Sequence, residues 1–272
     1  MAIKLSICNE MFQDWKIEDV FAYAGKMGYD GVEIAPFTLA DSVTDLSTGR
    51  RREIREAAAK AGVEITGLHW LLVSPKGLYI NHLDEEIRLR TQKYMIQLIE
   101  FCGDLGGKVM IVGSPKQRNV LEGQTYQATW ERTRAVFEAC LPTAEQRGVT
   151  LCLEPLDIHQ TNFLTDTAEV VNMVEEIDHP NLQLMVDVRS ASFGERETVA
   201  EVIYRVKDHL RHFHANDANE LGPGMGDVDY GPIAKALKEI GYEGYVSVEV
   251  FNFDPGPEVI AAKSLGYLRK FF

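Results

Sequence analysis

Short apolar runs rich in β-branched residues alternate along this chain with longer amphipathic segments. A strand-like period followed repeatedly by a helix-like period is typical of parallel strands connected by helices. The pattern predicts eight strands, at residues 5–9, 31–36, 64–70, 108–114, 150–156, 182–188, 212–217 and 245–251. The segments between them predict helices, for example at residues 17–28, 47–62, 84–107 and 167–178.

Eight strand and helix units in one chain of 272 residues fit a (β/α)8 TIM barrel, a single α/β domain spanning residues 1–272. An open, doubly wound sheet is the competing architecture. Such a sheet usually carries a glycine-rich phosphate turn after its first strand, where this chain reads CNEMFQDW. Because no glycine-rich nucleotide motif follows any predicted strand, the sequence favours the barrel and gives no sign of a nucleotide cofactor.

Four polar residues stand at the ends of the last four predicted strands. They are Glu154, Asp187, His214 and Glu249, separated by 33, 27 and 35 residues. In a parallel barrel these side chains converge at one end, and buried charges there are costly unless they are paired or bind a metal. Each residue alone could be a structural ion-pair partner. Together, three carboxylates and one imidazole predict a divalent-metal site with open positions, for Mn²⁺ or Mg²⁺ first and Co²⁺ as a further candidate.

Composition excludes several classes of partner. With 28 basic and 41 acidic residues the net charge is -13, which disfavours nucleic acid and anionic membrane surfaces. No run of about 18 apolar residues predicts a membrane span, and the first residues do not resemble a signal peptide. The four cysteines show no C-x-x-C spacing and read as reduced thiols. We therefore expect a cytoplasmic protein without nucleic-acid or membrane partners, and the sequence leaves a homo-oligomer open.

The segments around the four residues carry a family resemblance. LEPLDIHQTNFLTDT, LMVDV, HFHANDAN and YVSVEVF resemble the metal motifs of the sugar phosphate isomerase/epimerase superfamily, the xylose isomerase-like barrels that include ketose 3-epimerases, inosose dehydratases and endonuclease IV. The resemblance implies one divalent ion held by Glu154, Asp187, His214 and Glu249. It also implies that Glu154 and Glu249 move a substrate proton through an enediolate. The expected activity is isomerisation or epimerisation of a small carbohydrate: a sugar, sugar phosphate or keto-polyol.

Three residues depart from the ketose 3-epimerase pattern. Gln160 replaces a glutamate, Ser190 a histidine and Glu220 an arginine, all at positions that contact substrate in that branch. These changes leave open a lyase or dehydratase that acts on a keto-sugar or keto-inositol, and a sugar-binding barrel without catalysis is a third alternative. The nuclease branch is disfavoured because its additional zinc-binding histidines are missing and the chain is acidic.

Five residues near the predicted mouth are candidates for substrate binding: His69, Gln160, Arg189, Lys116 and Arg118. His69 ends the third predicted strand and could instead form hydrogen bonds inside the barrel. Lys116 and Arg118 lie in the loop GSPKQRN, where two cations could hold a phosphate or carboxylate, although a solvated loop is the simpler explanation.

Four further residues have two interpretations each. Glu33 could orient a sugar hydroxyl or pair with a cationic side chain in the barrel. His212 lies two residues before the predicted ligand His214, and we expect it to support the site or fill the barrel. Trp15 and Trp70, just past the first and third predicted strands, could line the pocket or the core.

Overall fold

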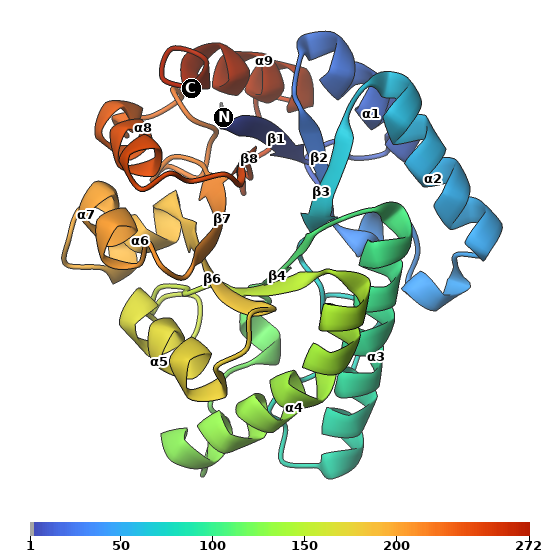
Figure 1. The fold of residues 1–272 in the computed structure, drawn as a ribbon, viewed down its shortest axis with the longest axis vertical. Coiled ribbons are helices and arrows are strands. Elements are labelled where there is room, and N and C mark those ends of the chain that lie inside the picture. The colour runs from blue at the N-terminus through green and yellow to red at the C-terminus, as the bar shows by residue number, and fades with distance from the viewer. Residues whose placement is uncertain (1–2) are drawn as a thin grey trace.

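The computed structural model describes residues 3–272, which form a closed barrel of eight parallel strands with helices outside it (Figure 1). Each strand pairs with its neighbour in sequence, and β8 pairs with β1 to close the ring. This topology confirms the predicted (β/α)8 barrel and excludes the open sheet. The predicted domain limits stay a prediction, since Met1 and Ala2 lie outside the described residues.

The strands match the predicted apolar runs to within a few residues. They are β1 (Lys4–Cys8), β2 (Gly31–Ile34), β3 (Glu64–Leu68), β4 (Val109–Val112), β5 (Thr150–Leu153), β6 (Leu182–Asp187), β7 (Leu210–Ala215) and β8 (Tyr245–Val248). The third strand ends two residues before the predicted limit, and the chain has turned by Trp70, whose φ is 52°. The seventh begins two residues earlier than predicted, at Leu210.

The connecting segments form the helices that surround the barrel. They are α1 (Ile17–Met27), α2 (Thr48–Ala61), α3 (Glu85–Leu105), α4 (Tyr126–Arg147), α5 (Thr167–Ile177), α6 (Val188–Gly194), α7 (Val199–Arg205), α8 (Tyr230–Glu239) and α9 (Pro257–Leu268), with short 3-10 helices η1 (Pro36–Thr38), η2 (Val43–Asp45) and η3 (Pro115–Gln117). Within the described residues no helix is long and apolar enough to cross a membrane.

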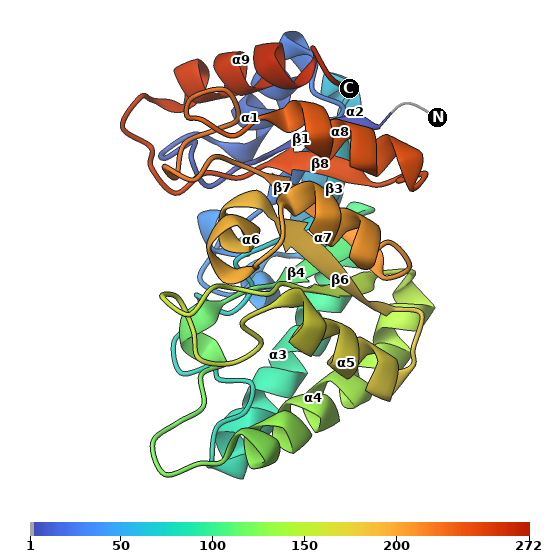
Figure 2. The same ribbon diagram turned by 90° about the vertical axis from the view of Figure 1, so that its left-hand side faces the viewer.

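The barrel places the functional end away from the chain termini. In Figure 2 the start of β1 and the C-terminus after α9 lie on the side where the strands begin, and the loops that follow the strands lie on the opposite side. Glu154 directly follows β5, Asp187 ends β6, His214 is the last residue but one of β7, and Glu249 directly follows β8. The strand arrangement therefore directs these four residues to the same end of the barrel.

Candidate metal centre and active site

The structure brings the four predicted ligands into one buried cluster. Donor atoms of Glu154, Asp187, His214 and Glu249 all lie within 4.8 Å of one another. The four residues are between 0% and 6% exposed. Such a concentration of buried carboxylates is unfavourable unless a cation or protons neutralise it. The cluster therefore has the composition and compactness that a divalent cation requires.

The orientation of His214 is fixed from inside the barrel by Glu33. Nε2 of His214 lies 3.1 Å from Oε1 of Glu33, and Nε2 of His212 lies 2.8 Å from Oε2 of the same carboxylate. Although complete burial opposes ionisation, the two imidazoles hold the pKa of Glu33 well below its usual range. A carboxylate that accepts from one ring nitrogen leaves the other nitrogen free to bind a metal.

The free nitrogen of His214 faces the cluster. Its Nδ1 lies 2.9 Å from Oε2 of Glu249, and in the described part of the chain neither atom has a hydrogen-bond partner. With bonds of 2.0–2.1 Å to an octahedral cation, neighbouring ligand atoms are about 3 Å apart. The separation and the missing hydrogen bonds both fit two donor atoms that share one divalent ion.

Local structure holds the other two carboxylates in place. Asp187 is the N-cap of α6, so its Oδ1 accepts from the backbone N–H of Ser190 at 2.7 Å, and its Oδ2 accepts from Nδ2 of Asn216 at 2.5 Å. Glu154 extends over Gly113, at the end of β4, where a Cβ atom would lie 1.8 Å from its Oε2. The absent side chain at Gly113 thus provides the space that the Glu154 carboxylate occupies.

The surroundings of the two glutamates shift their pKa values in opposite directions. Burial, and then the nearby Glu249 carboxylate, raise the pKa of Glu154 to about 8. Burial also opposes ionisation of Glu249, but the His214 imidazole outweighs it and lowers the pKa of Glu249. Burial and Glu249 raise the pKa of Asp187. Two carboxyl groups with separated pKa values can act as acid and base in the same site.

A cavity of about 310 Å³ lies above the cluster, and Glu154 and Glu249 form part of its wall. The predicted substrate-binding residues His69, Gln160 and Lys116 also line it. So does Trp70, whose Nε1–H donates to Oε1 of Glu249 at 2.9 Å. The cavity has the size expected of a site for a small molecule.

Neighbouring side chains occupy one ring nitrogen of His69 and the amide nitrogen of Gln160. Nε2 of His69 lies 2.6 Å from Oε2 of Glu10, and its Nδ1 lies 3.8 Å from Oε1 of Glu33. Nε2 of Gln160 donates to Oδ2 of Asp157 at 2.8 Å and contacts the Ser190 hydroxyl at 3.2 Å. These positions agree with the alternative that His69 forms hydrogen bonds inside the barrel.

Arg118, predicted to contact substrate, does not line the cavity. It is 2% exposed, and its guanidinium donates to the backbone carbonyls of Glu154 at 2.7 Å and of Val112 and Leu164 at 3.3 Å. The prediction is wrong because the side chain turns inward and connects the segments after β4 and β5. The sequence shows that Arg118 is in the loop but does not reveal which way it points.

Arg189 also lies outside the cavity wall. Its NH1 is 3.1 Å from Oδ2 of Asp157 and its NH2 is 3.1 Å from Oε1 of Glu220. Two of the positions that sequence analysis identified, Arg189 and Glu220, are therefore paired with each other. The Arg189 guanidinium therefore belongs to an ion-pair network beside the cavity and does not form part of the cavity wall.

The structure decides between the two interpretations of Glu33 and of Trp15, and it adds two supporting residues that the sequence did not indicate. Glu33 is 0% exposed and pairs with the barrel histidines, which confirms the second of its two interpretations. Trp15 packs against Phe12 and Tyr23 instead of the cavity. Asn216 and Gly113 were not identified as supporting residues. A charged residue inside the apolar strand GVEI was the available signal for Glu33, whereas Gly113 gave none.

The comparisons with known proteins agree with this geometry. The family model for xylose isomerase-like TIM barrels matches residues 21–271. The chain belongs to this family. A D-psicose 3-epimerase of Enterocloster bolteae is 30% identical over 264 residues, which cover 91% of this chain and 80% of that protein. A probable ketose 3-epimerase of Synechocystis is 26% identical over 269 residues, covering 93% and 90%.

A solved member with the same barrel is a 3-keto-D-glucoside 4-epimerase from E. coli. It covers 99% of this chain and 100% of its own, with a TM-score of 0.86 and 22% identity, and this likeness concerns the fold. The family resemblance seen in the sequence is confirmed. The names of the curated relatives also confirm the prediction of an isomerase or epimerase rather than a binding protein without catalysis.

Proposed function

We propose that this protein epimerises or isomerises a keto-sugar with one divalent cation held by Glu154, Asp187, His214 and Glu249. The observation that carries the proposal is the pair Nδ1 of His214 and Oε2 of Glu249, which lie 2.9 Å apart in the buried four-residue cluster and have no hydrogen-bond partner among residues 3–272. When bound, a divalent cation supplies Lewis-acid polarisation of a carbonyl group, which acidifies the neighbouring C–H bond and stabilises an enediolate.

Glu154 and Glu249 are the proposed proton carriers. They come from β5 and β8, which are separated in the barrel by β6 and β7, and both reach the same cavity. A flat enediolate between them meets one carboxyl group on each face, so one group removes a proton and the other delivers a different proton to the opposite face. The hydrogen bond from Trp70 positions one oxygen of Glu249. Because Gly113 has no side chain, the Glu154 carboxylate can occupy the space above it.

The cavity wall supports a sugar that carries an anionic group. Lys116 and Lys76 both line the cavity, and within residues 3–272 neither ammonium group has an acidic partner within 4 Å. In a chain with a net charge of -13, two free cations at a substrate cavity favour a phosphate or carboxylate on the substrate. Gln160 and the imidazole of His69, which also line the cavity, are proposed to make the remaining polar contacts with the substrate. The relatives named ketose 3-epimerase and D-psicose 3-epimerase support a keto-sugar.

The ligand set favours Mn²⁺ or Mg²⁺, and Co²⁺ is the next candidate, because carboxylate-rich sites prefer hard cations. Arg189, which we predicted to bind substrate, is proposed instead to hold Glu220 and Asp157 beside the cavity. We propose no role in substrate binding for Arg118, whose guanidinium is occupied by backbone carbonyls.

The test is a screen of ketoses, with and without phosphate or carboxylate groups, against protein depleted of metal and then loaded with Mn²⁺, Mg²⁺ or Co²⁺. We expect metal-dependent conversion to a product of unchanged mass, strongest for an anionic ketose, and loss of turnover in Glu249→Gln. A product lighter by one water would favour the lyase alternative, which the changed residues Gln160, Ser190 and Glu220 leave open. Turnover that persists without metal would overturn the proposal.

A further inference from the structure

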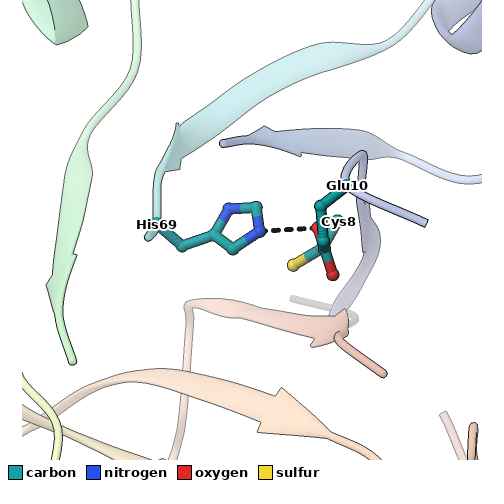
Figure 3. Close-up of side chains that lie close together, drawn as sticks. All are labelled: Cys8, Glu10 and His69. Carbon is teal, nitrogen blue, oxygen red and sulfur yellow. Dashed lines mark hydrogen bonds and ion pairs between the residues drawn. The ribbon is translucent and has the colours of Figure 1, made fainter. Parts of the chain in front are cut away.

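A second group of metal-binding side chains lies at the ends of β1 and β3. Donor atoms of Cys8, Glu10 and His69 lie within 4.8 Å of one another, and all three residues are buried. Figure 3 shows the imidazole of His69 pointing toward Cys8 and Glu10. Cys8 is the last residue of β1, Glu10 lies two residues further along, and His69 directly follows β3. None of the three is among the four residues assigned to the proposed catalytic cation.

The protein leaves donor atoms in this group without partners. Oε1 of Glu10 is buried and has no hydrogen-bond partner among the described residues. Nδ1 of His69 also has none, but it lies on the side of Glu33, 3.8 Å from its Oε1, and is not the nitrogen next to Glu10. The Cys8 sulfur lies 3.5 Å from the Ser247 hydroxyl, a hydrogen bond in which either group can be the donor. A buried carboxylate oxygen without a donor is unfavourable and requires an explanation. A bound cation next to the carboxylate would provide the missing interaction.

We infer that Cys8, Glu10 and His69 form a second metal site, selective for a zinc-like divalent cation. A thiolate, a carboxylate and an imidazole are the three ligand types that zinc and cobalt accept together, whereas Mg²⁺ avoids sulfur. As the metal–sulfur bond forms, the thiol proton leaves to solvent. The proton of the hydrogen bond between Nε2 of His69 and Oε2 of Glu10 moves to Nδ1 of His69 or also leaves to solvent. The thiolate and carboxylate then carry two negative charges, which balance the two positive charges of the cation.

The geometry requires little rearrangement. In a tetrahedral site with bonds of 2.0–2.1 Å to nitrogen and oxygen, the two ligand atoms are about 3.3 Å apart. The present distance between Nε2 of His69 and Oε2 of Glu10 is 2.6 Å, so this hydrogen bond must open by less than about 1 Å. Three protein ligands leave one position of a tetrahedral ion open. Because His69 also lines the substrate cavity, the second ion would lie next to the proposed active site.

Cobalt provides a specific test because the proposed catalytic cluster contains no sulfur. We would titrate metal-free protein with Co²⁺ and record the near-ultraviolet absorption from thiolate-to-cobalt charge transfer, together with the number of ions bound. We expect two ions per chain and a charge-transfer band that belongs to one of them. Cys8→Ser should remove the band and one bound ion, and Glu10→Gln and His69→Gln should weaken binding of that ion at least tenfold.

Two controls separate this site from the proposed function. Cys140→Ser, which alters a buried cysteine in α4, should retain the band. Glu154→Gln should weaken the other ion and leave the band unchanged, so failure of one site is visible independently of the other. A single bound ion without the band in the wild-type protein would overturn the inference. So would a band that survives in both Glu10→Gln and His69→Gln, since Cys8 would then bind together with Glu33 and His214.

Discussion

Gly113 offers a precise perturbation of the proposed catalytic centre. In Gly113→Ala the new Cβ would lie 1.8 Å from Oε2 of Glu154, whereas ordinary contacts begin at 3.4 Å, so the carboxylate must move by about 1.6 Å. Metal–ligand distances tolerate changes of only about 0.2 Å, so Glu154 would no longer reach the ion. We expect metal affinity to fall about 10–100-fold and kcat/KM about 100-fold or more.

The same substitution should have little effect on folding. The atom that must move is the end of a flexible side chain, and Gly113 does not have a left-handed backbone. The free energy of unfolding of the metal-free protein should change by less than about 1 kcal/mol. Metal affinity would be measured by isothermal titration and stability by urea unfolding. Gly266→Ala is the matched control, because a Cβ there meets nothing within 4 Å. Wild-type metal affinity and kcat/KM in Gly113→Ala would refute the reasoning.

Four further predictions concern single side chains and the pH dependence of metal binding. Glu33→Gln should lower metal affinity about 10–100-fold in isothermal titration, because the carboxylate that orients the ligand histidine is lost; unchanged affinity would contradict that role. Arg118→Leu should lower the free energy of unfolding by about 2–4 kcal/mol, since buried backbone carbonyls lose their donor. Lys116→Ala, by contrast, should leave the free energy of unfolding unchanged and raise KM only for anionic substrates. Because the pKa of Glu154 is raised to about 8 in the metal-free protein, metal binding must displace its proton at lower pH. Against the effect of burial, Glu249 and Glu33 also raise the pKa of the ligand His214, so its proton must leave as well. Affinity should therefore rise at least about tenfold per pH unit from pH 6 to 8, and a flat profile over that range would contradict this.

The four proposed metal ligands could be predicted because the signal is local and the topology is regular. Each of Glu154, Asp187, His214 and Glu249 follows or ends an apolar run, and any parallel barrel brings such residues to the same end. Neither step depends on the conformation of a loop. The predicted convergence therefore agrees with the structure although the strand limits differ by up to three residues.

The residues that were misplaced all depend on loop paths or on side-chain direction. Arg118 and Lys116 are two residues apart, yet one is buried against carbonyl groups and the other lines the cavity. The pairing of Arg189 with Glu220 joins segments after β6 and β7, and the contact of Glu10 with His69 joins segments after β1 and β3. Sequence patterns give the strand end on which a residue lies, but not which of several neighbouring groups it contacts.

The most direct test of the central claim is turnover of an accepted ketose by metal-loaded protein in deuterated water, followed by NMR of the product. If Glu154 and Glu249 act on opposite faces of an enediolate, the proton that is returned differs from the proton removed. The account predicts one deuterium in the product, at the carbon that changes configuration, and none at other positions. Product that forms at the normal rate with no deuterium at that carbon would contradict the proposed proton transfer.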